Sequence, residues 1–308
     1  MRIVFLGNPA FALPTLSSLS GSRHEVLAVV TSSEKARGRG MKQTAGPVAS
    51  FARESNIPLI QPKSLKSELL VASLQELNPD LLVVVAFKIL PRTLLGIPKK
   101  GCINLHGSLL PKYRGAAPIQ QALMNGDSVT GLTTFILAPA VDTGDLLLTK
   151  KVVIYPDDDC GSLSKRMSHM GASLVMETID GIDNDTLTPI QQDDSCASKA
   201  PKIKPEMCQM QWRKSAVKIH NLVRALSPVP SAYTFVKGRR MKIFKTSFSA
   251  LPPVTPGEII NADESSLVVS CGSGSLELSD VQIEGKRRMT VTQFLQGFKL
   301  SPGERFGA

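Results

Sequence analysis

Short apolar runs alternate with amphipathic stretches along the first half of the chain, and this alternation restricts the fold more than any other feature of the sequence. Each run has the length of a strand, and the stretches between runs have helical periodicity. Strands that alternate with helices form parallel sheets covered by helices on both faces. We therefore predict a Rossmann-like α/β domain with an open, mostly parallel sheet. The predicted strands are Ile3–Leu6, Val26–Thr31, Leu81–Ala86, Cys102–Leu105, Leu132–Leu137 and Leu146–Ile154, and the predicted helices are Pro47–Ser55, Leu65–Leu77 and Ser162–Ile179.

The pattern changes near residue 185. Polar residues and prolines predict a linker over residues 186–205. One amphipathic helix, Ser215–Leu226, follows, and then come short strand-like runs separated by turns, which are typical of a small barrel. A chain of 308 residues is also long for one compact core. We predict an α/β domain at residues 1–185 and a smaller, mainly-β domain with an OB-like barrel at residues 206–308.

Positive charge is concentrated in the last third of the chain. Residues 201–308 carry 16 Lys and Arg against 8 Asp and Glu, whereas residues 1–200 carry 20 against 18. A basic domain of this kind favours a polyanionic partner, most often a nucleic acid. The alternative is a solvated basic surface with no partner.

Several classes of protein are disfavoured by what the sequence lacks. No apolar run reaches the roughly 18 residues of a membrane helix, and Met1-Arg2 runs directly into Ile3–Leu6, so we expect neither a membrane anchor nor a signal peptide. The five scattered cysteines indicate free thiols in a reducing cytoplasm. The first turn, Gly7-Asn8-Pro9-Ala10-Phe11, is not a dinucleotide fingerprint. The four histidines lack metal-ligand spacing, so we expect no metal.

Two polar clusters follow predicted strands. Asn104 and His106 are separated by two positions, so in an extended chain their side chains point the same way and could donate to one oxyanion. Asp142 lies in the turn between two later strands, where its carboxylate could orient His106 or accept a proton. The alternatives are an Asn-x-His that caps a loop and an ordinary Asp-Gly turn.

These residues carry a resemblance. Asn104-x-His106, followed by Ser108-Leu109-Leu110-Pro111 and by Val141-Asp142-Thr143-Gly144-Asp145, is similar to the motifs of the 10-formyltetrahydrofolate-dependent formyltransferases. Within this family the chain most resembles the enzymes that act on methionyl-tRNA. That similarity extends over nearly the whole chain and includes Gly38-Arg39-Gly40, Lys112 to Pro118, Ala200-Pro201-Lys202 and Gly285 to Met289.

The resemblance implies a reaction and its residues. The α-amine of methionine on initiator Met-tRNA would attack the formyl carbon of 10-formyltetrahydrofolate. By the family pattern, Asn104 and His106 hold the oxygen of the tetrahedral intermediate, and Asp142 pairs with His106 and helps to move the proton. The folate contacts implied are Phe87, Ile89, Leu90, Ser108, Leu109, Leu110, Pro111 and Val141; the loop 86–91 is one residue shorter than the usual family pattern and lacks its glycine.

The basic loop 33–42 is a candidate RNA contact, because arginine pairs well with phosphate and glycine lets the backbone approach it. The family pattern places this loop at the acceptor end of the tRNA; the alternative is a solvated basic loop. The predicted tRNA-binding residues are Arg37, Arg39, Lys42, Lys286, Arg287 and Arg288.

Two other functions compete with this one. The first is a folate-dependent formyltransferase that acts on a small amine of a sugar or nucleotide. The second is an RNA-binding protein on a degenerate enzyme fold, which loss of Asn104, His106 or Asp142 would have favoured. We expect a cytoplasmic monomer, because a bound tRNA already covers a large surface.

Overall fold

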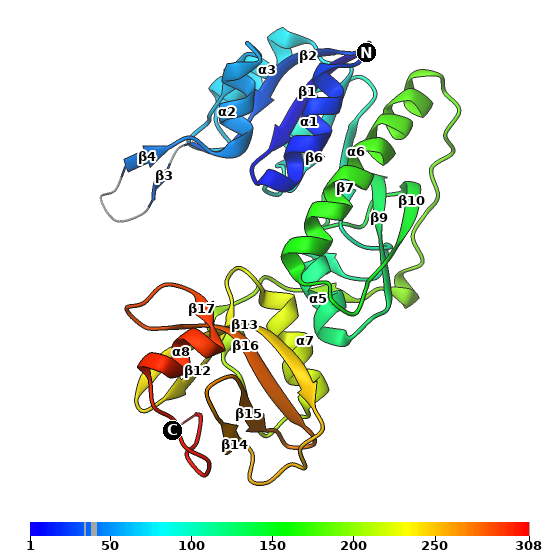
Figure 1. Cartoon of the computed structure of the whole chain (residues 1–308). Coiled ribbons are helices and arrows are strands. Elements are labelled where there is room, and N and C mark those ends of the chain that lie inside the picture. Colours follow the sequence, from blue (N-terminus) through cyan, green and yellow to red (C-terminus); the bar gives the residue numbers. More distant parts are fainter. Residues whose placement is uncertain (34, 38–41, 308) are drawn as a thin grey trace. The chain divides into compact units, whose positions relative to one another are not determined.

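The computed structural model describes residues 1–33, 35–37 and 42–307, and the chain divides into two compact units (Figure 1). The N-terminal unit consists of Met1–Pro118, Val129–Val153 and Ser164–Ala200. The C-terminal unit consists of Ile119–Ser128, Ile154–Leu163 and Pro201–Ala308.

The N-terminal unit is built on a seven-stranded sheet of order β10-β9-β7-β6-β1-β2-β5. Five neighbouring strands, β7, β6, β1, β2 and β5, run parallel. Strand β9 is antiparallel to β7, and β10 is antiparallel to β9. All five residues of β6 are buried, as expected for a strand covered on both faces. The prediction of an open, mostly parallel sheet is confirmed. The strands are β1 (Arg2–Gly7), β2 (Glu25–Val30), β5 (Leu59–Ile60), β6 (Leu81–Val85), β7 (Cys102–His106), β9 (Val129–Ile136) and β10 (Leu146–Val153).

Helices follow most of these strands. The buried side chains of α3 and α4 pack with those of β1, β2 and β6 in one apolar cluster. Helix α6 packs close to β7, since a Cβ at Gly171 would lie 2.6 Å from Cδ2 of Leu105. The sequence analysis missed α1, α4 and β5, which are short and carry little periodic signal. The helices are α1 (Leu13–Ser20), α2 (Pro47–Glu54), α3 (Glu68–Leu77), α4 (Arg92–Leu95) and α6 (Cys160–Asp183), and a hairpin of β3 (Lys35–Arg37) and β4 (Lys42–Thr44) precedes α2.

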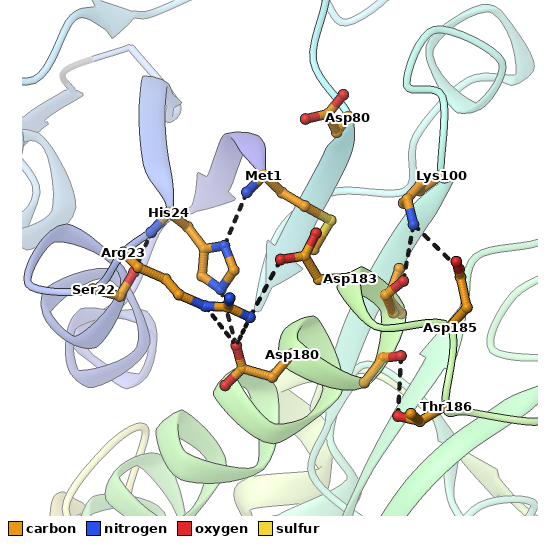
Figure 2. A network of polar contacts seen from close by, with 12 residues as sticks. Met1, Ser22, Arg23, His24, Asp80, Lys100, Asp180, Asp183, Asp185 and Thr186 are labelled. Carbon is orange, nitrogen blue, oxygen red and sulfur yellow. Dashed lines mark hydrogen bonds and ion pairs between the residues drawn. The ribbon is translucent and has the colours of Figure 1, made fainter.

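A polar network ties the end of α6 to the amino ends of the strands (Figure 2). Arg23 and His24, just before β2, both contact Oδ1 of Asp180, at 2.8 and 3.2 Å. Lys100, just before β7, donates to the carbonyl of Ile182 at 3.0 Å. The network lies at the sheet edge opposite to the carboxyl ends of the parallel strands.

The C-terminal unit is an antiparallel sheet of order β12-β13-β16-β15-β14. The chain end bridges the two outer strands, because Gly307 N donates to the Phe235 carbonyl of β12 and Phe306 N donates to the Gly257 carbonyl beside β14, both at 2.8 Å. The prediction of a smaller, mainly-β second domain is confirmed. The elements are α5 (Pro118–Asn125), α7 (Ala216–Leu226), β12 (Ala232–Val236), β13 (Arg239–Ser249), β14 (Ile259–Ala262), β15 (Leu267–Ser270), β16 (Ser275–Ile283), β17 (Met289–Thr290) and α8 (Val291–Gly297).

Two details of this unit differ from the sequence analysis. Only short strand-like runs were expected here, but Ser275–Ile283 forms one continuous strand, β16. Asp280 lies within this strand and pairs with Arg288. Helix α8 was not predicted; Thr290 and Gln293 form a capping box at its start.

Most of the predicted linker, residues 186–205, belongs to the N-terminal unit, which extends to Ala200. Lys199–Ala200 (β11) pairs in parallel with Arg114–Gly115 (β8). Gln192 is buried. This segment therefore contributes to the surroundings of the polar clusters described next.

Candidate active site

Asn104 and His106 lie on β7, at the carboxyl end of the parallel part of the sheet. Within the sheet, Asn104 is aligned with Val84 of β6 and Phe135 of β9. Ligands of open α/β sheets bind at this edge. The alternation of the strand sends Leu105 toward α6 and places Asn104 and His106 together on the other face.

His106 is almost enclosed, with 6% of its surface exposed. Its Nε2 lies 2.8 Å from the Tyr113 carbonyl. A carbonyl can only accept, so Nε2 carries the proton in this bond. The other ring nitrogen, Nδ1, faces the carboxylate of Asp142 at 3.7 Å. Nδ1 is therefore the atom of His106 that can exchange a proton.

Two opposing effects act on the pKa of His106. Burial is the larger and lowers the pKa, whereas the charge of Asp142 and the bond to Tyr113 raise it. The net shift is downward from the ordinary value of 6.5. At neutral pH the imidazole is then mainly uncharged, and its Nδ1 can accept a proton.

Asp142 is held in the loop between β9 and β10 by an unusual backbone. Its φ of 53° is left-handed, and its Oδ2 accepts a hydrogen bond from Gly115 N at 2.8 Å. The loop also needs a glycine two residues later, because a Cβ at Gly144 would lie 1.7 Å from the Ile136 carbonyl oxygen. The turn that the sequence predicted thus brings Asp142 to His106.

The side-chain oxygen of Asn104 is buried and has no hydrogen-bond partner among the described residues. Buried polar atoms are normally paired, and an exception calls for an explanation. Since this oxygen can only accept, a donor on a substrate, such as an amine N–H, would be the partner that it lacks. Asn104 stands two positions from His106, so such a substrate would also meet the imidazole.

Hydrogen bonds within the loop after β7, and from Thr133 of β9, hold this loop in place. The hydroxyl of Ser108 is fully buried and donates to the Lys112 carbonyl at 2.6 Å. Thr133 of β9, which the sequence analysis missed, donates to the Ser108 carbonyl at 2.7 Å and accepts from Leu110 N at 3.1 Å. Leu110 is buried as well, with 5% of its surface exposed. These contacts fix the backbone of the segment that contains Leu109 and Pro111, two of the predicted folate contacts.

The other predicted folate contacts lie on neighbouring loops. Phe87, Ile89 and Leu90 follow β6, and the loop starts at Ala86 with a left-handed φ of 48°. Ile89 and Val141 are large apolar side chains, yet 72% and 46% of their surfaces are exposed. Both side chains are therefore accessible to a ligand.

The predicted tRNA contacts fall in three places. Arg37 and Lys42 lie opposite each other in the backbone register of the β3–β4 hairpin, and Arg39 lies outside the described residues. Lys286 and Arg287 are exposed between β16 and β17 of the C-terminal unit. Arg288 already pairs with Asp280 and lies 4.3 Å above the Phe244 ring.

Two side chains missed by the sequence analysis contact the Asp142 loop or its neighbours. Gln192, from the predicted linker, donates to the backbone carbonyls of Asp142 and Gly144. Arg114 donates to Gln192 in turn. A glutamine among other polar residues gives no periodic or motif signal, so the sequence alone could not single it out.

Within residues 1–33, 35–37 and 42–307, no group of three or more His, Cys, Asp or Glu side chains is arranged to hold a metal ion. No helix in the same ranges is long and apolar enough to cross a membrane.

Comparison with known proteins covers both units. The formyl transferase family matches residues 1–179, and the C-terminal domain of formyl transferases matches residues 202–299. The methionyl-tRNA formyltransferase of Geobacter metallireducens is 44% identical over 308 residues, spanning 100% of this chain and 99% of that protein. The enzyme of the same name from Acetivibrio thermocellus is 44% identical over 310 residues, spanning 100% of both chains.

Solved structures share the fold at low sequence identity. HypX from Aquifex aeolicus in complex with tetrahydrofolic acid has a TM-score of 0.69 at 18% identity, over 98% of this chain and 49% of that chain. The sugar 3N-formyl transferase WlaRD has a TM-score of 0.68 at 18% identity, over 93% and 99% of the chains. A methionyl-tRNA formyltransferase from Clostridium thermocellum has a TM-score of 0.57 at 16% identity, over 81% and 94%.

Proposed function

The chain belongs to the formyl transferase family, and we propose that it transfers the formyl group of 10-formyltetrahydrofolate to the α-amine of methionine on initiator Met-tRNA. The observation that carries this proposal is the match over the full length, C-terminal domain included, to relatives named methionyl-tRNA formyltransferase. The product, formylmethionyl-tRNA, serves translation initiation.

The chemistry requires the protein to stabilise an oxygen and to move a proton. A bond forms between the methionine nitrogen and the formyl carbon, the bond from that carbon to the folate nitrogen breaks, and a proton passes from one nitrogen to the other. The amine of the substrate is the nucleophile, so no serine or cysteine nucleophile is needed. An α-amine has a pKa near about 8, which leaves a useful neutral fraction at pH 7.

Asn104, His106 and Asp142 divide these tasks. The amide of Asn104 donates to the oxygen that becomes negative, a contribution of roughly 3–4 kcal/mol per donor. Because Nε2 of His106 is engaged with Tyr113, His106 donates to that oxygen from Nδ1 once this atom has gained a proton. Asp142, 3.7 Å from Nδ1, stabilises the charged imidazole and helps to pass the proton on.

The residues around this centre fit a folate. The donor carries its formyl group on N10, between its pterin and aminobenzoyl rings, and the exposed side chains of Ile89 and Val141 offer those rings apolar surface. Leu90 is buried in the apolar cluster of β1, β2, β6, α3 and α4, and Phe87 packs against that cluster. Both residues therefore anchor the loop after β6, which carries Ile89. The other proposed contacts, Ser108, Leu109, Leu110 and Pro111, come from the segment after β7, in which the buried Ser108 and Leu110 fix the backbone that presents Leu109 and Pro111.

For the tRNA we propose two cationic surfaces. Lys286, Arg287 and Arg288 belong to the C-terminal unit and would bind phosphates, which adds affinity with little sequence information. Arg37, Arg39 and Lys42, from the hairpin region, would bind the acceptor end. We further propose that the enzyme acts as a cytoplasmic monomer.

One assay tests the proposed function. The protein is supplied with formyl-labelled 10-formyltetrahydrofolate and, separately, with initiator Met-tRNA or a nucleotide-linked amino sugar as acceptor. We expect label to enter Met-tRNA. Label in the amino sugar alone would favour the small-amine alternative, and label in neither acceptor would favour the RNA-binding alternative.

A further inference from the structure

The segment from Gln192 to Ala200, which we call the strap, crosses the N-terminal unit beside the candidate active site. We propose that Gln192 is a positioning residue and that the strap holds the two partners of His106, Asp142 and the Tyr113 carbonyl, in their working places. This inference rests on the proposed roles of His106 and Asp142.

The side-chain amide of Gln192 is buried, with 8% of the residue exposed, and both of its ends are engaged. Its Nε2 donates to the carbonyls of Asp142 and Gly144 at 3.0 and 2.7 Å. Its Oε1 accepts from Nε and a terminal nitrogen of Arg114 at 3.1 and 2.7 Å. Carbonyls only accept and a guanidinium only donates, so these partners determine the orientation of the amide.

The Asp142 loop needs such support. The left-handed φ of 53° at Asp142 is unfavourable for a residue with a side chain. The carbonyls of Asp142 and Gly144 would lose their Gln192 partner if this side chain were shortened, and a buried carbonyl without a partner is costly. The loop would then relax, and the Asp142 carboxylate would move with it.

The other end of the strap holds the second partner of His106. Tyr113 N donates to Oγ of Ser198 at 2.9 Å, and Arg114 N donates to the Ser198 carbonyl at 2.8 Å. Gly115 allows the close approach, because a Cβ there would lie 2.5 Å from the Ala200 carbonyl oxygen. The carbonyl of Tyr113, thus placed, fixes the proton on Nε2 of His106.

Gln192 acts on the chemistry only through Asp142, and this predicts a specific effect. Among the described residues, the charged group that acts on His106 is Asp142, whose charge raises the pKa of the imidazole against the effect of burial. When the loop relaxes, this support weakens and the pKa of His106 falls further. Turnover should fall because the imidazole no longer holds its proton during the reaction.

The test compares Gln192→Ala and Gln192→Glu with wild type. Gln192→Glu keeps an acceptor for Arg114 and replaces the donor to the loop carbonyls by a carboxylate oxygen. Its added negative charge also acts on His106, so the fall in the pKa of His106 is tested with Gln192→Ala alone. We expect both variants to lose about 10- to 100-fold in kcat, the range for displaced catalytic groups, with KM for folate and Met-tRNA changed less than about threefold. The pKa of His106, read from its ring resonance among only four histidines, should fall in Gln192→Ala.

Thr178→Val is the matched control. Thr178 is buried in α6 and bonds to Thr134 and to the Leu174 carbonyl, both at 2.7 Å. The substitution costs buried hydrogen bonds without touching the Asp142 loop. It should lower the melting temperature and leave kcat and the His106 titration unchanged. Should Gln192→Ala not fold, Gln192→Met, which keeps the side-chain volume, takes its place.

The outcomes separate this inference from the proposed function. Wild-type kcat in the Gln192 variants and an unchanged His106 titration in Gln192→Ala would overturn the positioning role, and so would a rise in KM alone. If the wild-type protein does not formylate Met-tRNA, the proposed function fails, but the titration of His106 still decides whether the strap positions Asp142.

Discussion

The N-terminal unit holds two histidine–aspartate pairs at opposite edges of one sheet, and they are built differently. His24 contacts Asp180 at 3.2 Å, and its other ring nitrogen contacts the Met1 amine at 3.1 Å (Figure 2). His106 stands 3.7 Å from Asp142, beside an Asn104 oxygen that has no partner among the described residues. Both ring nitrogens of His24 have a partner at hydrogen-bond distance. At the second pair, Nδ1 of His106 and the oxygen of Asn104 can still form hydrogen bonds to a ligand.

The partners of the two histidines also differ in their access to water. The side chain of Asp180 is 48% exposed and is shared with Arg23, whose hydrogen bond is the main cause of the lowered pKa of Asp180. Although His24 itself is buried, a carboxylate as exposed as Asp180 gains little stability from its charged partners. The side chain of Asp142 is only 12% exposed. By this comparison the first pair is a minor structural contact, whereas we propose that the buried and incompletely bonded second pair serves a reaction.

The largest effect should come from Asn104. Asn104→Ala removes the amide that we propose as an oxyanion donor, so kcat should fall by about 100-fold or more. Affinity for folate and tRNA should barely change, because the proposed contact forms with charge that develops during the reaction. Steady-state kinetics and equilibrium binding check this. Turnover near that of wild type would refute the oxyanion role.

The second effect sharpens the comparison of the two pairs. Asp142→Asn keeps the shape and the acceptor for Gly115 N but removes the charge beside His106, and we expect turnover to fall by about 100-fold, the lower end of the range for a lost general acid–base group. Asp180→Asn removes a charge from the pair at the other edge. It should leave kcat within about twofold and lower the melting temperature slightly, mainly at low salt. Equal losses of kcat in both variants would contradict the distinction.

A third, smaller effect concerns the tRNA. Lys286→Ala with Arg287→Ala should weaken Met-tRNA binding and reduce the slope of log affinity against log salt by about one per lost phosphate contact. KM for folate should not change. Lys99→Ala, which removes the cation 3.6 Å from Asp80 in the N-terminal unit, is the control and should leave the slope intact. An unchanged slope in the double variant would mean that these side chains are only solvated surface.

The smallest effect is on stability. Burial lowers the pKa of His106 from 6.5, so below about pH 6.5 the unfolded chain binds more protons than the folded one. This residue therefore costs stability as the pH falls through 6.5 toward its folded pKa, and costs nothing above that window. Melting temperatures of wild type and His106→Asn between about pH 5 and 7.5 check this. A pH dependence identical in both proteins would refute it.

The sequence predicted the parts of the site that carry local patterns. The apolar runs identified β1, β6 and β7, and the two-residue spacing of Asn104 and His106 placed them on one face of a strand end. For Asp142 the sequence left an ordinary turn and a carboxylate that orients His106 as alternatives, and the family resemblance favoured the second.

Other parts could not be predicted, for physical reasons. Thr133 and Gln192 act through hydrogen bonds to backbone atoms that are far away in the sequence, and such bonds impose no periodicity. Gln192 also lies in a polar stretch that resembles an unstructured linker. The closure of the second sheet by residues 306–307 depends on two edge strands meeting one terminal segment, which no local pattern encodes.

The most direct test of the account is to compare the two histidines in one reaction. Single-turnover transfer of labelled formyl from 10-formyltetrahydrofolate to initiator Met-tRNA is measured for wild type, His106→Ala and His24→Ala, after each variant is shown to be folded. We expect His106→Ala to lose about 100-fold or more and His24→Ala to stay within about threefold of wild type, as expected for loss of a purely structural pair. Near-wild-type transfer by His106→Ala, or an equal loss in both variants, would contradict the account.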